Sequence, residues 1–184
     1  QRRFVNDPMM LQVLDESTSR IATMSYINES LYQNTDFSSI SFAEYLERLT
    51  VNLMSSYAQQ LDPVELRTHL DELHLNLEQA IPCGLIVNEL VSNAMKYAFK
   101  GVSDGELFLR AEVQDEFVEI EVADNGVGLP EDFNFDTNDS LGVYLIQALT
   151  EQIQAELIVR SSSLDGAHNI PRGSSFIIKF VPSS

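Results

Sequence analysis

A polar stripe runs along an otherwise apolar stretch of the sequence. Residues 88–97 read NELVSNAMKY, and the flanking segments IPCGLIV and AF have the spacing of a buried helix. At about 100° per residue, Glu89, Asn93 and Lys96 fall on one side of that helix within roughly 60°, away from Ile86. An acid, a neutral oxygen ligand and a base together differ from the Glu/Lys repeats that usually make a helix face soluble. The stripe is therefore either a solvated helix face or part of a site.

A second candidate site follows a predicted strand. Asp124 ends the alternating segment FVEIEVAD and is followed by Gly126 and Gly128 in DNGVG. A carboxylate fixed at a strand end can accept a hydrogen bond from an exocyclic amine, and glycines let the backbone approach a flat ligand or take positive φ. Asp-Asn-Gly is also ordinary turn sequence, so this motif alone supports a turn and a site equally. Downstream, Gly142 in SLG opens a further helix, whose amides and positive dipole end can bind an anion.

Together these three segments describe a nucleotide pocket. Asp124 would accept from an adenine amino group, and the amides near Gly142 would bind phosphates. Asn93 would offer a neutral oxygen to Mg²⁺, which takes oxygen ligands beside phosphate oxygens. Lys96 can then lie against phosphate, and Glu89 can orient water or act as a base. We therefore expect the polar stripe to face the metal ion and the phosphates.

The composition limits the class of protein. The 184 residues are 44% hydrophobic, enough for one core with a small helical appendage. No apolar run approaches the ~20 residues that span a bilayer, and QRRFVNDPMM has no stretch resembling a signal peptide. The single cysteine, Cys83, fits a reducing cytoplasm and is expected in the core. The chain starts without Met, so we expect a fragment of a longer cytoplasmic protein.

The charge balance is strongly acidic. Eleven basic against 28 acidic residues give a net charge of -17. This charge opposes nonspecific binding to nucleic acid or to anionic lipid. An anionic ligand would need local compensation from a cation, helix amino termini and the few basic side chains.

The first sixty residues are predicted to be helical. Asp7 followed by Pro8 is a helix start signal. The seam that follows has spacings of three and four: Met10, Leu14, Ser17, Ile21, Met24, Asn28 and Leu31. Such a seam suits a helical hairpin or bundle that pairs with another chain, and one long helix covering the core is the alternative. A capping box of Ser41 and Glu44 then begins a second helix.

From about residue 66 a period of two predicts strands. The alternating segments are LHLNL, ELFLRAEV, FVEIEVAD, ELIVRSSS and SSFIIKFV, of which the last four form two hairpins. The helix with the polar stripe follows LHLNL, and a helix VYLIQALTEQI separates the hairpins. We therefore predict an α+β fold: a two-layer sandwich of a mixed, mostly antiparallel sheet with helices on one face.

The three candidate segments also resemble the motifs of a known family. NELVSNAMKYAF resembles the N box, DNGVGLP the G1 box and SLGVYLIQAL the G2 region of the GHKL ATPase superfamily, in the form found in sensor histidine kinases. AIPCGLIVNELVSNAMKYAF and RIATMSYINESLYQ are most similar to the HWE-related branch of those kinases. The resemblance implies a GHKL-type ATP-binding catalytic domain over residues 61–184. It also implies a partial helical dimerisation segment with a connecting helix over residues 1–60.

The resemblance implies roles for individual residues. By matching positions, Glu89 is catalytic and Asn93 is the ligand of Mg²⁺. The implied ATP-binding residues are Asn93, Asp124, Gly126, Gly128, Gly142 and Ser174, to which the polar stripe adds Lys96. Ser174, in GSSF, stands where many relatives place a Thr near the adenine. The chain departs from the family at two points: the second box has one Gly in place of a Gly-x-Gly pair, and Tyr97 occupies a position that is often His.

The resemblance implies an ATP-dependent protein histidine kinase. The γ-phosphoryl group of Mg-ATP would pass to a His upstream of this fragment and then to a response regulator, in a homodimer joined by the N-terminal helices. QRRFVND resembles the end of the helix that carries this His, and His69, His74 and His168 lack the helical context of an acceptor. Two alternatives keep the fold: a non-catalytic regulator that binds nucleotide and a partner protein, and a protein serine kinase. Glu89 and Asn93 favour an enzyme over the regulator.

Overall fold

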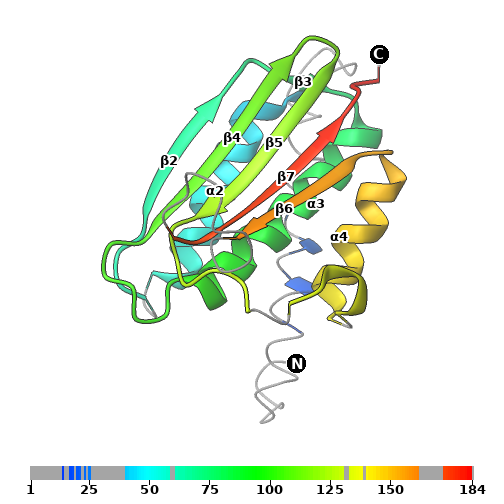
Figure 1. The fold of residues 1–184 in the computed structure, drawn as a ribbon. Helices are drawn as coiled ribbons and strands as arrows, with labels where there is room; N and C mark the ends of the chain where they lie inside the picture. Colours follow the sequence, from blue (N-terminus) through cyan, green and yellow to red (C-terminus); the bar gives the residue numbers. More distant parts are fainter. Residues whose placement is uncertain are drawn as a thin grey trace.

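A five-stranded sheet forms one layer of the fold (Figure 1). The structure is a computed structural model that describes residues 14, 17, 18, 20, 21, 23, 25, 40–58, 61–130, 133–138, 140–161 and 172–183. The strands of the sheet are β2 (Glu65–Leu70), β4 (Glu106–Gln114), β5 (Phe117–Asp124), β6 (Glu156–Ser161) and β7 (Ser174–Phe180). Their order is β2-β4-β5-β7-β6, in which β2 runs parallel to β4 and the other neighbours are antiparallel. The sheet is therefore mixed and mostly antiparallel, as predicted.

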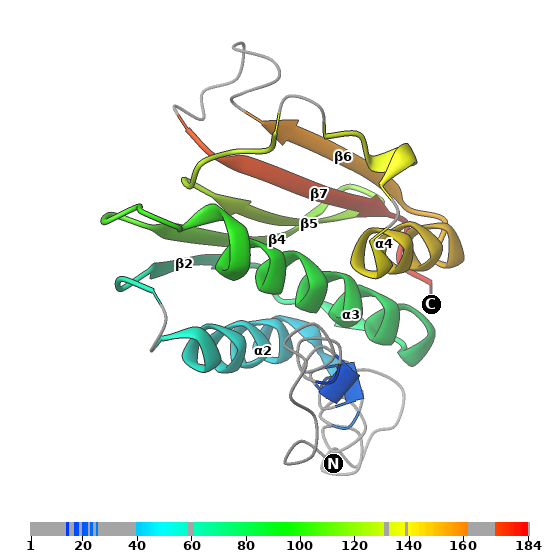
Figure 2. The ribbon, with the colours of Figure 1, turned by 90° about the horizontal axis from the view of Figure 1, so that it is seen from below.

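Helices cover one face of this sheet (Figure 2). The central helix is α3 (Leu77–Asn93), which continues into the π-helical segment η2 (Ala94–Ala98). The helices α2 (Phe42–Tyr57) and α4 (Leu141–Gln152) pack against α3 from either side, and a short 3-10 helix η3 (Phe135–Thr137) precedes α4. The predicted α+β sandwich with helices on one face is confirmed. No helix in the described ranges is long and apolar enough to cross a membrane.

The core lies between α3 and the sheet. Every second residue of β4 and β5 points toward α3, because side chains alternate between the two faces of a strand. The buried residues of these two strands include Leu107, Leu109, Ala111, Val118, Ile120 and Val122. On α3, burial continues almost without interruption from Pro82 to Ser92. Cys83 is fully buried among these residues, as predicted, and burial raises the pKa of its thiol.

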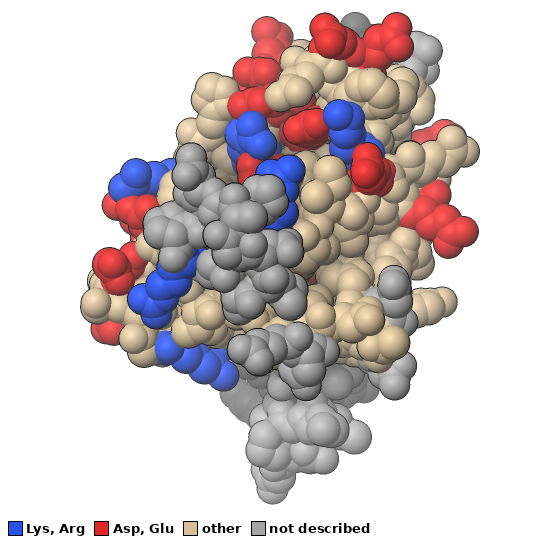
Figure 3. All heavy atoms as spheres, viewed as in Figure 1, with Lys and Arg blue, Asp and Glu red and all other residues tan. Residues whose placement is uncertain are grey.

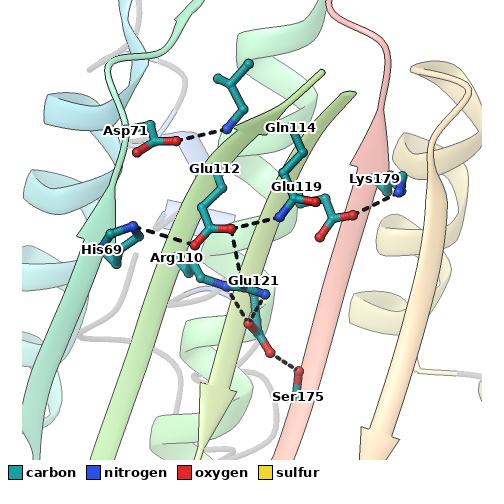
Figure 4. Close-up of polar contacts among 10 residues, drawn as sticks. His69, Asp71, Arg110, Glu112, Gln114, Glu119, Glu121, Ser175 and Lys179 are labelled. Atoms are coloured by element: carbon teal, nitrogen blue, oxygen red, sulfur yellow. Dashed lines mark hydrogen bonds and ion pairs between the residues drawn. The ribbon is translucent and has the colours of Figure 1, made fainter. Parts of the chain in front are cut away.

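The opposite face of the sheet carries charged side chains of both signs (Figure 3). Arg110 of β4 lies between two acids: its Nη1 is 3.1 Å from Glu112 Oε2, and its Nη2 is 2.8 Å from Glu121 Oε2 (Figure 4). Lys179 Nζ of β7 lies 2.9 Å from Glu119 Oε1 of β5. Ion pairs at a protein surface are each worth about 0 to 1 kcal/mol, so the main effect of these half-buried pairs is to compensate the acids on this face.

The segment directly before α3 differs from the prediction. LHLNL was expected to form a strand, but only its residues His74–Leu75 pair, as β3, with β1 (Ile40–Ser41) in a separate two-stranded sheet. The Asn76 side chain accepts a hydrogen bond from the Gln79 amide at 3.1 Å and begins α3 there, so the strand cannot continue. The edge strand of the main sheet is instead β2. Its sequence ELRTHL is mostly exposed and shows little apolar alternation.

Of the two predicted helical segments, the second can be compared with the structure in full and the N-terminal one only in part. The second helix is present as α2, whose buried residues include Phe42, Tyr45, Leu46, Leu49 and Leu53. Of the predicted N-terminal seam, Met10, Met24, Asn28 and Leu31 lie outside the described residues. Leu14 is half-buried, whereas Ile21 is 64% exposed.

Candidate active site

Asp124 occupies the end of β5, as predicted, and is only 4% exposed. Its Oδ1 accepts a hydrogen bond from the Gly126 amide at 2.9 Å, and its Oδ2 accepts one from Ser174 Oγ at 2.5 Å. The β5–β7 register places Asp124 directly opposite Ser174, which explains why these two distant residues meet. Burial raises the pKa of the Asp124 carboxyl above its ordinary value, against the opposing effect of these hydrogen bonds. Each carboxylate oxygen still has a lone pair for a further donor.

The loop after Asp124 is pressed against the end of η2. The Val127 amide donates to the Ala98 carbonyl at 2.9 Å. A Cβ at Gly126 would lie 2.3 Å from that same carbonyl oxygen, so no larger residue fits there without moving the backbone. Gly128 has a φ of +77°, a conformation that glycine adopts at little cost. The two glycines predicted for the site thus have separate reasons: one allows a close approach and the other a left-handed turn.

Glu89 and Asn93 lie one turn apart on α3, beside the beginning of α4. Glu89 is 5% exposed, so the polar stripe is not a solvated helix face at this position. A Cβ at Gly142 would lie 3.0 Å from Glu89 Oε2 and 3.9 Å from Asn93 Nδ2. Because Gly142 has no side chain, the first turn of α4 comes close to both polar groups. The Ser140 side chain caps this helix by accepting from the Val143 amide at 3.3 Å.

Lys96 lies in η2, where the spacing of an α-helix no longer holds. The prediction that Lys96 shares a face with Glu89 and Asn93 assumed about 100° per residue, whereas hydrogen bonds in a π-helix run from i to i+5. Lys96 is half-buried in this segment, and the neighbouring Tyr97 is 56% exposed. The assignment of Lys96 to phosphate stays a prediction. Single π-helical turns are frequent at functional sites.

Arg20 contacts Glu89, and no sequence pattern predicted this contact. Arg20 Nε lies 2.7 Å from Glu89 Oε1, and Arg20 Nη2 lies 3.0 Å from Glu89 Oε2. The Asn88 side-chain amide also donates to Glu89 Oε1, at 3.4 Å. Both members of the ion pair are largely removed from water, with 14% and 7% of their side chains exposed. Periodicity along one helix cannot reveal such a contact, because the two residues are 69 positions apart.

Two other polar residues that support the site were also missed. Asn125 accepts from the Glu106 amide and donates to the Asp104 carbonyl, both at 2.8 Å, and so ties the loop to the start of β4. Ser161 Oγ accepts from the Leu129 amide at 3.0 Å, which holds the far end of the same loop. The Asp-Asn-Gly sequence predicted a turn at Asn125, but it did not predict these contacts. Ser161 is one of three consecutive serines at the end of the predicted strand ELIVRSSS, and nothing in the sequence distinguishes it from the other two.

The donor set suits a magnesium ion held together with phosphate. In the parts of the chain that the structure describes, no group of three His, Cys, Asp or Glu side chains is arranged to hold a metal ion. Mg²⁺ bound beside phosphates usually keeps several waters and takes only one or two protein ligands. Asn93, whose side chain lies beside the first turn of α4, can supply its amide oxygen as such a ligand, and Glu89 can orient a metal-bound water. Magnesium would neutralise phosphate charge there.

The two described histidines lie on other elements than the residues of this site. His69 lies exposed in β2, and its Nε2 is 3.6 Å from Glu112 Oε1 on the open face of the sheet (Figure 4). His74 is exposed in β3, and His168 lies outside the described residues. Neither described histidine lies on a helix, in agreement with the sequence prediction.

Comparison with known proteins gives a separate family match for each of two parts of the chain. Residues 78–184 match the family described as histidine kinase-, DNA gyrase B-, and HSP90-like ATPase, and residues 1–57 match one described as histidine kinase. The sensor histidine kinase PdtaS of Mycobacterium tuberculosis (strain CDC 1551 / Oshkosh) is 27% identical over 147 residues, which are 79% of this chain and 28% of PdtaS. An anti-sigma F factor of Shouchella clausii (strain KSM-K16) is 30% identical over 96 residues, covering 52% of this chain and 56% of that protein.

A solved structure shares the fold. The histidine kinase domain from the Erythrobacter litoralis EL346 blue-light activated histidine kinase superposes with a TM-score of 0.76 at 22% identity, covering 91% of this chain and 74% of that domain. The family matches and the curated relatives confirm the resemblance to sensor histidine kinases, and they support a kinase role. Because the ATPase match extends over more than half of its residues, this chain belongs to the histidine kinase-, DNA gyrase B-, and HSP90-like ATPase family.

Proposed function

We propose that this chain is the ATP-binding kinase part of a two-component sensor histidine kinase. In this proposal the γ-phosphoryl group of Mg-ATP passes to a histidine upstream of the fragment and from there to a response regulator. Residues 61–184 bind nucleotide, and residues 1–60 belong to a helical dimerisation segment. The observation that carries the proposal is the approach of the first turn of α4 to Glu89 and Asn93, which Gly142 permits. Such a helix start, next to an oxygen ligand for metal, is suited to phosphates.

The two ends of the site have different tasks in this proposal. At one end Asp124, held by Gly126 and Ser174, accepts a hydrogen bond from the adenine amine. At the other end the amides of α4 bind phosphate oxygens, and Asn93 ligates Mg²⁺. Lys96 contributes positive charge near the phosphates, and Glu89 accepts the proton of the attacking group or orients it. Phosphoryl transfer depends mainly on such positioning and charge compensation, because it needs little covalent chemistry from the protein.

Replacing Asn93 with Ala tests the phosphate end. We expect affinity for Mg-ATP to fall by about 1 kcal/mol, because one ligand of the metal is lost, while affinity for adenosine stays nearly unchanged. Titration calorimetry with Mg-ATP, with ATP in a chelator and with adenosine separates these contributions. A loss of equal size for adenosine and for Mg-ATP would place Asn93 elsewhere in the site.

The likeness to an anti-sigma F factor favours a second candidate function. That protein's name describes a regulator that acts on another protein, and its match covers 52% of this chain. On the same fold, this chain could bind nucleotide and hold a partner protein, or transfer phosphate to a serine. Acid-labile label on an acceptor segment indicates phosphohistidine, whereas acid-stable label indicates phosphoserine. Nucleotide binding without transfer to either kind of acceptor would favour the non-catalytic regulator.

Self-association through the N-terminal helices is part of the proposal. Ile21, a member of the predicted seam, is 64% exposed, which leaves an apolar side chain for a second copy to cover. We expect a longer chain that includes the preceding helix to sediment as a dimer. Ile21→Asp should weaken that dimer about tenfold or more, because it removes roughly 1.5 kcal/mol of apolar burial. Val181→Asp changes another exposed apolar residue, 56% exposed at the C-terminal end, and should have no effect. A monomer at high concentration would contradict the proposal.

A further inference from the structure

The Arg20–Glu89 ion pair links the N-terminal helical segment to the nucleotide site. Arg20 presents two nitrogens of its guanidinium to the two oxygens of Glu89, at 2.7 and 3.0 Å. This bidentate geometry makes arginine–carboxylate pairs strong and directional. Both side chains are mostly buried, so water and salt screen the pair less than a surface pair. The contact is therefore a defined connection between two parts of the chain.

The Glu89 carboxylate is enclosed by three groups in this arrangement. Arg20 contacts both oxygens, the Asn88 amide contacts Oε1, and Gly142 of α4 lies next to Oε2. To orient a water or to accept its proton, a carboxylate must present an oxygen lone pair to that water at hydrogen-bond distance. While the guanidinium contacts both oxygens, the remaining lone pairs of the carboxylate face Asn88 and α4. Glu89 is in this state paired with Arg20 through both oxygens, so an attacking group would have to share a carboxylate oxygen with the guanidinium.

We propose that Arg20 is an autoinhibitory latch on Glu89. The helical segment holds the carboxylate in a non-reactive state, and a displacement of that segment withdraws Arg20 and releases Glu89 for chemistry. This inference rests on the proposed function, since it assigns a regulator to the same site. It identifies Arg20 as the residue through which movement of the helices reaches the bound nucleotide.

The latch predicts that removing Arg20 increases the turnover of Mg-ATP. In the full chain without a histidine acceptor, a water can attack the γ-phosphorus, Glu89 takes a proton from that water, and the bond from the γ-phosphorus to the bridging oxygen breaks. The products are ADP and inorganic phosphate. In Arg20→Gln we expect phosphate release at saturating Mg-ATP to rise at least about fivefold, the lower end of typical couplings between two sites. Measuring at saturation excludes changes in affinity that follow from the lost positive charge.

Two control variants separate the latch from simple loss of an arginine. Arg110→Gln removes an arginine that pairs with Glu112 and Glu121 on the opposite face of the sheet, and its turnover should equal that of the unchanged chain. Arg20→Gln combined with Glu89→Gln should lose the entire gain, because the released base is absent. Circular dichroism and thermal unfolding confirm that each variant is folded. Arg20→Lys provides a second test: it keeps the charge but cannot span both oxygens, so it should show an intermediate gain.

The outcomes distinguish the latch from the proposed function. A gain in Arg20→Gln that depends on Glu89 supports the latch. Unchanged or reduced turnover in folded Arg20→Gln overturns it, and so does a gain that persists without Glu89. Calorimetry with Mg-ATP on the same samples tests the proposed function separately. If the variants bind Mg-ATP but show no gain, the nucleotide site stands and the latch fails, whereas a folded chain that binds no Mg-ATP contradicts both.

Discussion

Incubation of this chain with γ-labelled Mg-ATP is expected to leave no acid-labile label on His69, His74 or His168. His69 and His74 are exposed residues of β2 and β3, and His69 lies beside Glu112 on the face of the sheet opposite the helices. A bound phosphoryl donor without a positioned acceptor loses the advantage of proximity, which is worth about 7 to 11 kcal/mol of the barrier. We therefore expect binding of Mg-ATP without self-phosphorylation.

Adding the acceptor separately gives the matching positive result. A helical segment from upstream of this chain that carries a histidine should acquire acid-labile label when mixed with the chain and γ-labelled Mg-ATP. The transfer should be lost in Glu89→Ala and Asn93→Ala, whereas His69→Gln should transfer as well as the unchanged chain. Label that appears on His69, His74 or His168 of the isolated chain would show that the acceptor was assigned wrongly.

The fold could be predicted where short-range patterns agree with the tertiary structure. The alternating segments that became β4 and β5 each bury one face, so a period of two was a sufficient signal. The same period also selected β6 and β7, although β6 is mostly half-buried and β7 is buried on both faces over most of its length. The prediction was wrong around residues 73–77, where a capping asparagine starts α3 two residues after β3 begins. The edge strand β2 was missed because its exposed residues need no apolar alternation. A strand that buries one face leaves an apolar alternation in its sequence, whereas an exposed edge strand leaves little alternation.

The site could be predicted only in part, for a similar reason. Asp124 and Gly126 are neighbours in the chain, and Gly142 opens its helix, so local motifs were enough to select them. Two features depended on geometry that no local pattern contains. The change to a π-helix at Ala94 alters the direction of every later side chain on that helix, including Lys96. The contact of Arg20 with Glu89 depends on how a separate segment packs across α3, which a period within one helix cannot encode.

Asp124→Asn is expected to weaken ATP binding by roughly 1 to 3 kcal/mol, the cost of a mispaired buried polar group. The Gly126 amide can still donate to the asparagine oxygen, but Ser174 and the adenine amine would meet an amide nitrogen where Oδ2 had been. Two donors then oppose each other in a site that is 4% exposed. Calorimetry with ATP and with adenosine should show similar losses, because the adenine end is shared. Asp71→Asn is a matched control, since Asp71 accepts only from the Val113 amide in a surface strand.

The pH dependence of binding provides an independent test of Asp124. Burial raises the pKa of this carboxyl above its ordinary value, so the group takes up a proton at a higher pH in the folded chain than in the unfolded chain. The contribution of Asp124 to the free energy of unfolding is therefore least favourable above the raised pKa and improves as pH falls through it. Adenine binding has the opposite sign, because the ionised carboxylate is a stronger acceptor for the amine than the protonated acid. Adenosine affinity should fall as pH drops through the raised pKa, while stability without ligand gains from the same protonation. Asp124→Asn removes both effects, and an adenosine pH profile that is unchanged in this variant would show that Asp124 does not contact the base.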